Sequence, residues 1–484
     1  MKNLLASSFC SQFLIVLLLT SCILDEDNSA PNIEDQTFSI AETSESGALV
    51  GTIMAMDDDG DELIFTILSG NTNSVFVLDP VSGELTVSVA GELSVATLPS
   101  YSLNVQVTDG TDTSNATITI NVTEQGGGGE QPTPTSESFE SAEEVREGLV
   151  EGYALFRNFV EYHYLFDAVY ANTNSAPSGD WDAVHGHTLT STNDKVLKLW
   201  EDAYDLIFLA NNVYNSAQDL LSGDELNEVQ GQALVMRAYA YHIIFIWFEN
   251  APVEEEFPES EPEFVTRGEI LDLAIAYLDE AETLLPASWT GEDVGNFSQD
   301  LAKALKTRIY QLQLSIQSGS YANVMATAGS LISGANYTLS NSSDNFTASD
   351  SEIIGGFDIS SGTSFESVFP KGDYVPISRY SETLLLNAEA MVNTGSLIDA
   401  LNVVNDLRLR DELSEVMSAT SQELIEFIIE LYQTEMVFEG LDFFVLKRFE
   451  LAENDLSIEA HRLLLPIPQE VIDNNPNAFQ NPGY

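Results

Sequence analysis

Residues 125–135 read Gln125-Gly-Gly-Gly-Gly-Glu-Gln-Pro-Thr-Pro-Thr135, with four consecutive glycines and two alternating prolines. This stretch has no apolar side chain that can join a core, so we expect a linker over residues 125–137. The hydrophobic pattern differs on its two sides. Before the linker, apolar residues alternate with period two, and after it they recur every three or four positions. The 484-residue chain is therefore predicted to contain two domains of different fold.

Residues 32–124 are predicted to form an all-β sandwich. The segments Tyr101–Val107 and Ala116–Val122 alternate apolar and polar residues, as half-buried strands do. Turn-forming residues separate such runs, among them Asp57-Asp-Asp-Gly60 and Asp109-Gly110. Short strands spaced regularly over this length are typical of two packed antiparallel sheets.

Residues 138–484 are predicted to be mainly α-helical. In one segment Ile270, Ala274 and Leu278 fall on a single helical face. Further helical stretches are expected near residues 141–170, 194–221, 298–317, 320–333, 379–393, 397–409 and 421–440. Helices of this length joined by short turns indicate stacked helical hairpins.

The N-terminus has the pattern of a secretory signal. One lysine, Lys2, precedes an apolar run that is too short to span a bilayer, and Leu19-Thr-Ser-Cys22 follows it. That tetrapeptide resembles a lipobox, which predicts a signal peptide over 1–21 and a lipid on the sulfur of Cys22. Residues 22–31 are then the tether. Cys10 lies inside the signal, so the mature chain has no cysteine pair for a disulfide.

The composition is strongly acidic, with 17 basic and 77 acidic residues and a net charge of −60. Nucleic acid is an improbable partner because its binding requires cationic surface. Two interpretations of the charge stay open, namely solubility and cation binding at carboxylate clusters. The acidic residues after Cys22 also allow two interpretations. They resemble the export signal of surface lipoproteins in Bacteroidetes, and they are equally explained as a solvated tether.

Several helical segments carry a family pattern, in the family's order and over roughly residues 140–484. They are Trp200–Ile207, Gly231–Tyr241, Ala302–Tyr310, Ile377–Ala390, Phe438–Arg448, Leu465–Val471 and Gln480–Tyr484. Together they resemble the SusD/RagB family of outer-membrane nutrient-binding lipoproteins. The sequence departs from the family at Asp442, where Arg is usual, and at Val445, where Asp is usual.

The resemblance implies a large helical domain of tetratricopeptide-like hairpins that binds a glycan at the exterior of the outer membrane. It also implies a partner, a TonB-dependent transporter of the SusC type. We find no Gly-x-Ser-x-Gly, His-Glu-x-x-His or phosphate-binding loop, so we expect no enzyme. The alternative function is a surface adhesin or scaffold that binds other proteins through the β domain and the helical hairpins.

The β domain resembles one cadherin repeat, on the segments Ala55–Gly60, Phe76–Leu85 and Val105–Gly110. Cadherin repeats bind calcium at their poles through carboxylates, and the resemblance implies Asp57, Asp59 and Asp109 as ligands. Asp27, in the preceding tether, is implied to complete the site. Calcium requires six to eight oxygen ligands, so several acids must converge. The alternative interpretation is a polar hairpin turn. No other cofactor is required, and we expect the domain to act as a spacer.

Sugars are bound by aromatic faces flanked by hydrogen-bonding groups, and aromatic residues on loops are the better candidates because those on helices usually pack in the core. Loops are expected near residues 171–193, around Trp289 and near 336–376. The predicted ligand-binding residues are Trp181, Tyr170, His185, Trp289 and Tyr374.

Overall fold

The structure is a computed structural model that divides into two compact units, Met1–Gly127 and Gly128–Tyr484. The boundary falls within the glycine run 126–129. The structure describes residues 28, 30–33, 36–41, 49–53, 55–57, 63–81, 83–89, 93–94, 98, 100–123, 138–173, 181–253, 262–289, 296–340, 346–359, 365, 369–372 and 374–484. Cys22, Asp27 and Asp59 lie outside these residues.

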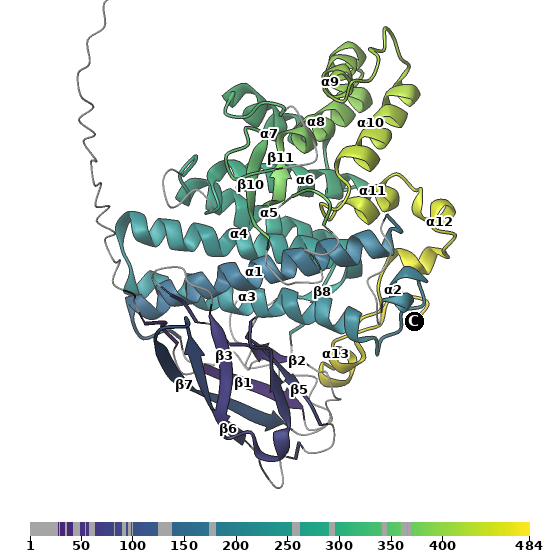
Figure 1. Ribbon diagram of the computed structural model, residues 1–484. Coiled ribbons are helices and arrows are strands. Elements are labelled where there is room, and N and C mark those ends of the chain that lie inside the picture. Colours follow the sequence, from purple (N-terminus) through teal and green to yellow (C-terminus); the bar gives the residue numbers. More distant parts are fainter. Residues whose placement is uncertain are drawn as a thin grey trace, which may run out of the picture. The chain divides into compact units, whose positions relative to one another are not determined.

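The N-terminal unit contains two sheets, drawn in purple and blue in Figure 1. One sheet has the strand order β1-β7-β6-β3 and the other β2-β5-β4. The strands are β1 (Gln36–Ala41), β2 (Leu49–Thr52), β3 (Ile64–Ser69), β4 (Phe76–Leu78), β5 (Glu84–Val87), β6 (Ser100–Thr108) and β7 (Thr113–Thr123). Of the strand pairs that the structure describes in this unit, β1 with β7 is parallel and the others are antiparallel. The predicted all-β region is thereby confirmed.

The hairpin of β6 and β7 shows how alternation in the sequence becomes a core. Leu103, Val105 and Val107 on β6 are fully buried, and their polar neighbours along the strand face outward. The turn between the strands is closed by Asp109, whose Oδ1 accepts hydrogen bonds from the backbone N–H groups of Thr111 and Asp112. An aspartate that bonds to backbone amides just after it is a frequent turn former.

The C-terminal unit is mainly helical, and it runs from blue to yellow in Figure 1. Its helices are α1 (Ala142–Tyr170), α2 (Asp182–His185), α3 (Asp194–Leu220), α4 (Gly223–Phe248), α5 (Arg267–Leu284), α6 (Gln299–Ser315), α7 (Tyr321–Gly334), α8 (Tyr380–Thr394), α9 (Leu397–Arg410), α10 (Ser421–Glu435), α11 (Asp442–Arg448), α12 (Ala452–Asp455) and α13 (Gln469–Asn474). The short strands are β8 (Ala251–Pro252), β9 (Phe264–Val265), β10 (Ile353–Asp358) and β11 (Tyr374–Arg379).

Successive helices from α3 to α9 pack against one another, which is the expected stacking of helical hairpins. In Figure 1, α1, α3 and α4 lie side by side along much of their length. The starts of several helices follow from N-cap side chains. The side chain of Asn193 accepts hydrogen bonds from backbone N–H groups in the first turn of α3. Thr420 and Glu423 form a capping box at the start of α10. No helix within the described residues is long and apolar enough to cross a membrane.

The segment 336–376 differs from the expected loop, because it contains β10 and the start of β11. These strands form an antiparallel pair in which Phe357 is opposite Val375 and Asp358 is opposite Tyr374. All six residues of β11 are buried, so the strand is an internal element of the unit. The two glycines of β10, Gly355 and Gly356, weaken its strand signal in the sequence.

A set of largely buried charges lies beside this hairpin, and we call it the buried ion network. Its centre is Arg379, which is 0% exposed. Its Nη1 lies 2.6 Å from Oε1 of Glu352, and its Nε lies 2.8 Å from Oε2 of Glu439. Lys371 pairs with the other oxygen of Glu439 at 2.5 Å, and Arg410 pairs with Glu352 at 3.3 Å. Glu435, which pairs with Arg410, completes the network.

Two more buried ion pairs lie in the segments that carry the family pattern. Arg308 on α6 binds Glu382 on α8 through two parallel hydrogen bonds of 2.6 and 2.8 Å. Arg448 on α11 binds Glu389 on α8 at 2.5 Å. These charged motif residues therefore hold helices together, and they are not free to contact a ligand.

Replacing Arg379 with leucine leaves Glu352 and Glu439 buried with fewer partners. Breaking a buried pair on one side costs roughly 3–5 kcal/mol, and we expect the free energy of unfolding of the helical unit to fall by about that amount. All four tryptophans lie in this unit, so urea unfolding followed by tryptophan fluorescence reports on it alone. The control is Arg157→Leu, at an exposed position of α1. Equal unfolding midpoints in the two variants would contradict the structural role of Arg379.

Candidate functional site

Two of the predicted binding residues, Trp181 and Tyr170, are part of the core. Trp181 is 7% exposed and packs against the rings of Tyr162 and Phe166. Tyr170 is 1% exposed, and its hydroxyl donates a hydrogen bond to the backbone oxygen of Arg462. Neither ring has a face open to a ligand, so their geometry favours a packing role. The sequence could not show this, because the residue type of an aromatic side chain does not reveal whether its ring is buried or exposed.

His185 is exposed at the C-terminal end of α2. It does not line either of the pockets of the helical unit described below. The two remaining predicted residues, Trp289 and Tyr374, line one pocket, which we call the aromatic pocket. Its volume is about 160 Å³. It is lined by Ser288, Trp289, Asn296, Phe297, Ser298, Leu301, Tyr337, Ala348, Ile353, Ile354, Gly355, Gly356 and Tyr374.

Trp289 is held in place by the segment that precedes α6. Its indole N–H donates to the backbone oxygen of Phe297 at 2.7 Å. The backbone N–H of Phe297 in turn donates to Gln232 on α4, and the Phe297 ring packs against Tyr153 and Phe156 on α1. The indole thus lies on a segment fixed to the core, and such support preorganises a binding surface.

Tyr337, which follows α7, forms a second wall of the aromatic pocket. Its hydroxyl donates to Oδ2 of Asp300 at 3.3 Å, and the side-chain amide of Asn336 donates to the same oxygen at 3.2 Å. Asp300 is 5% exposed, and its other oxygen pairs with Lys303. Burial, with the nearby Asp300 carboxylate, raises the pKa of Tyr337, so the hydroxyl stays protonated and can donate.

Tyr374, at the start of β11, also lines the pocket, although it is only 5% exposed and most of its ring is packed in the core. Gly356 on β10 lies against this ring, and a Cβ there would approach Cε1 of Tyr374 to 2.4 Å and the backbone oxygen of Val375 to 2.5 Å. Only glycine therefore allows the ring its position. Burial and Asp358 raise the pKa of Tyr374 to about 12. Sequence reasoning missed Tyr337. The available signal for the pocket was the glycine pair Gly355-Gly356, because glycine inside a strand often marks a place where a ligand or another chain segment approaches the backbone closely.

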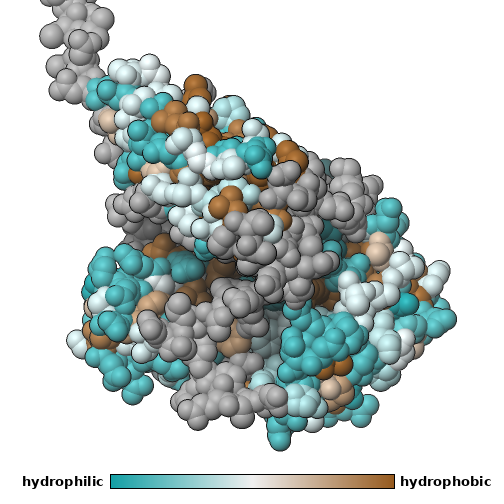
Figure 2. Space-filling view, turned by 90° about the horizontal axis from the view of Figure 1, so that it is seen from below, coloured by the Kyte–Doolittle hydropathy of each residue, from teal (hydrophilic) through white to brown (hydrophobic). Residues whose placement is uncertain are grey.

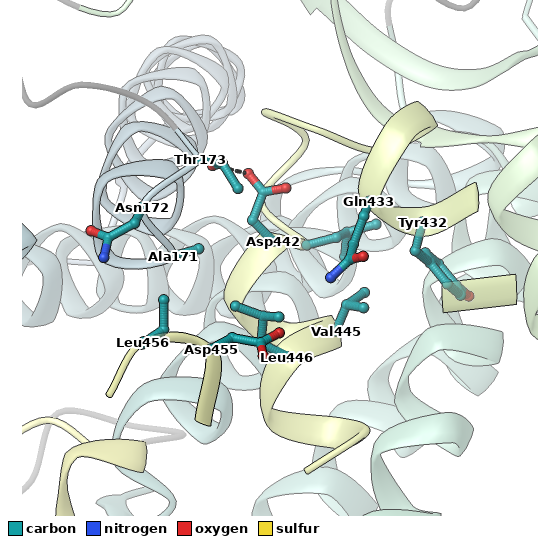
Figure 3. A pocket seen from close by; sticks show the side chains of 11 residues that line it. Ala171, Asn172, Thr173, Tyr432, Gln433, Asp442, Val445, Leu446, Asp455 and Leu456 are labelled. Carbon is teal, nitrogen blue, oxygen red and sulfur yellow. Dashed lines mark hydrogen bonds between the residues drawn. The ribbon is translucent and has the colours of Figure 1, made fainter. Parts of the chain in front are cut away.

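A second pocket of the helical unit, of about 290 Å³, has a different chemistry (Figure 3). It lies between the segment after α1 and helices α10, α11 and α12. Its one aromatic residue, Tyr432, is 2% exposed and offers no open face. Asp442 accepts a hydrogen bond from the hydroxyl of Thr173, and Figure 3 shows the carboxylate turned toward that residue. Burial raises the pKa of Asp442 to about 6. Although this pocket is larger, the aromatic pocket suits a sugar better.

In the β unit, part of the expected calcium site lies within the described residues. The side-chain amide of Asn28 donates to a carboxylate oxygen of Asp109 at 2.9 Å and of Asp112 at 3.0 Å. Asn32 and Met56 exchange two backbone hydrogen bonds, so Met56, the residue before Asp57, lies beside the N-terminal segment that contains Asn28 and Asn32. The N-terminal segment thus contacts the Asp109 turn through Asn28 and the residue before Asp57 through Asn32. Within the described residues, no group of three or more His, Cys, Asp or Glu side chains is placed to hold a metal ion.

Comparison with family profiles gives three matches. Residues 132–311 match the family described as "Starch-binding associating with outer membrane", and residues 363–463 match the SusD family. Residues 36–123 match the cadherin domain. Starch-binding protein SusD of Bacteroides thetaiotaomicron is 32% identical over 132 residues, and cadherin-4 of Caenorhabditis elegans is 34% identical over 102 residues. The matched regions span 23% and 2% of those two proteins, respectively.

Solved structures share the helical fold. A SusD-like protein of Bacteroides fragilis aligns with a TM-score of 0.62 at 15% identity, over 72% of this chain and 98% of that one. A laminarin-binding SusD-like protein aligns with a TM-score of 0.60 at 18% identity, over 72% and 100%. Surface glycan-binding protein A of Bacteroides uniformis aligns with a TM-score of 0.60 at 16% identity, over 70% and 99%. At these identities the likeness establishes the fold.

The exposure of the four tryptophans provides a direct test of the aromatic pocket. Trp289 is partly exposed, whereas Trp181, Trp200 and Trp247 are at most 7% exposed. Acrylamide should therefore quench mainly the emission of Trp289. We expect Trp289→Phe to remove most of the quenchable fluorescence, and the control Trp181→Phe to retain it. Equal quenching in the two variants would mean that Trp289 is no more accessible than Trp181.

Proposed function

The helical unit of this chain belongs to the SusD family, and from that premise we propose that it binds an oligosaccharide or polysaccharide in the aromatic pocket without transforming it. The observation that carries the proposal is the convergence of Trp289, Tyr337 and Tyr374 on one small pocket. Aromatic rings contact the C–H faces of a sugar, and the polar groups beside them bind its hydroxyls.

The polar groups of the aromatic pocket suit sugar hydroxyls. Ser288 and Asn296 line it with side chains that both donate and accept hydrogen bonds. Its volume of about 160 Å³ is below the range of pockets that enclose a drug-sized ligand, roughly 300–1,000 Å³. We therefore propose that one sugar ring enters the pocket and that neighbouring rings lie on the surface around it.

We further propose that the bound glycan passes to a TonB-dependent transporter of the SusC type. Family membership of the helical unit supports this partner, as does the lipobox-like segment that ends at Cys22. In this proposal the lipid on Cys22 anchors the chain to the outer membrane, at the exterior face, and the cadherin-like unit spaces the helical unit from the anchor. Co-purification of a transporter with the tagged lipoprotein from membranes would test the partnership.

Removing the indole of Trp289 should weaken glycan binding. We expect Trp289→Ala to lower affinity at least tenfold, about 1.4 kcal/mol, because stacking on the ring is lost. Affinity electrophoresis or calorimetry against a polysaccharide panel measures the change. Phe479→Ala is the control, at a half-exposed aromatic residue outside the pocket. Trp181→Ala should instead lower stability. Undiminished affinity in Trp289→Ala, with binding by the parent protein, would remove the aromatic pocket as the site.

We also propose that calcium binds the pole of the β unit at Asp57, Asp109 and the N-terminal segment, with Asp27 and Asp59 as further ligands. Calcium at tenfold its Kd should stabilise this unit by about 1.4 kcal/mol, which raises its melting temperature by several degrees. Calorimetry detects the transition. Tryptophan fluorescence should not follow it, because residues 22–124 contain no tryptophan.

In the calcium experiment Asp109→Asn should abolish the shift, whereas Asp224→Asn, at an exposed position of α4, should retain it. An excess of chelator should return the parent protein to its calcium-free melting temperature. If calcium leaves the melting of the parent protein unchanged, the pole is a polar turn only.

A further inference from the structure

The 17 lysines and arginines of this chain are distributed unevenly. None lies between residues 22 and 124, so the whole β unit of the mature chain has no cationic side chain. Apart from Lys2, all of them lie in the helical unit, at residues that the structure describes. Acidic residues number 77 and are spread over both units. A negatively charged ligand therefore meets a surface with very few cations.

Most cations of the helical unit are already paired with carboxylates, in the buried ion network and in other ion pairs. Within the described residues four are not in such a pair: Arg157, Lys195, Arg237 and Arg462. Arg237 is buried and donates to the Tyr277 hydroxyl. Arg462 donates to the backbone oxygen of Leu189, and Lys195 lies over the ring of Trp181. Arg157 alone of the four is exposed.

The described residues that line the aromatic pocket are all uncharged. Two carboxylates lie behind its walls, since Asp300 accepts a hydrogen bond from Tyr337 and Asp358 ends the strand that contains Gly356. Arg379 is opposite the lining residue Ile353, but it is bound to Glu352 and Glu439. Lys303 lies close by, but it is bound to Asp300 at 3.1 Å and to Gln299 at 2.9 Å. No cation within the described residues is thus available to a ligand in the pocket. On the face seen in Figure 2, the coloured residues are mostly teal and white, with brown hydrophobic groups scattered among them.

This charge pattern has a consequence for ligand choice. A carboxylate or sulfate that leaves water requires a charged partner, most often arginine, and its desolvation is otherwise unfavourable. Long-range repulsion by the −60 net charge adds to this cost at low salt. Salt screens the repulsion beyond about 8 Å at physiological ionic strength, but it does not supply the missing partner in the pocket. A neutral sugar avoids both penalties.

We propose that the aromatic pocket selects uncharged sugars, so that the ligand of this chain is a neutral oligosaccharide or polysaccharide and polyuronates and sulfated glycans are rejected by charge. The inference rests on the proposed function of glycan binding. It adds the chemical class of the ligand, which neither the fold nor family membership specifies.

The test compares polymers that share a backbone and differ in charge, with chelator present to prevent calcium bridging. Suitable pairs are laminarin with carboxymethylated laminarin and dextran with dextran sulfate, measured by affinity electrophoresis on the intact lipid-free protein. For each pair in which the neutral polymer binds, we expect its affinity to be at least tenfold higher than that of its anionic partner. The difference should hold both at low salt and at 0.5 M salt, where the screening length is about 4 Å. Affinity for the neutral polymer should not vary with salt.

A variant with an added positive charge in the pocket provides a second test of charge selection. Ser288 lines the pocket and is exposed, so Ser288→Arg places a guanidinium at its edge. We expect this variant to improve the ratio of anionic to neutral affinity severalfold relative to Ser288→Gln, which has similar length and no charge. If the parent protein binds an anionic polymer as tightly as its neutral partner, selection by charge is wrong and glycan binding stands. If no polymer of a broad panel binds, the proposed function itself fails, and the selection fails with it.

Discussion

Burial of the Arg379 guanidinium is the constraint on which the C-terminal half of the helical unit depends. A charge that is 0% exposed is stable only when opposite charges and hydrogen bonds surround it. Glu352, just before β10, and Glu439, between α10 and α11, supply the carboxylates. The backbone oxygen of Glu435 accepts a further bond. One side chain therefore fixes the relative positions of a hairpin and two helices.

The same constraint positions the aromatic pocket. Strand β11 begins at Tyr374 and ends at Arg379, and β10 begins directly after Glu352. The hairpin is thus held by the buried ion network at one end, and its other end presents Gly356 and Tyr374 to the pocket. Because these charges are paired inside the fold, the described walls of the pocket proposed to bind the ligand consist of neutral aromatic, polar and aliphatic residues.

Much of this architecture is predictable from the sequence, because period and composition determine it locally. Strands β6 and β7 and helices such as α1 and α3 lie close to the predicted ranges. The binding residues are less predictable, since the identity of a ring does not reveal its burial. Trp181 and Trp289 both lie in loop regions, yet one packs under Lys195 and the other lines a pocket. Tyr337 and Tyr374 come to line one pocket only because of strand pairing and packing between distant segments, which the local sequence pattern does not reveal.

The family motifs and the proposed ligand site are therefore carried by different residues. Arg308, Arg379 and Glu382 lie in the segments that make the chain resemble its family, and all three are in buried ion pairs. Trp289 and Tyr337 lie outside those segments. Motif residues that hold helices together permit one fold to carry many ligand specificities, because the pocket walls can change without breaking a buried pair. The ligand must then be inferred from the pocket, whose walls in this chain are aromatic, polar and uncharged.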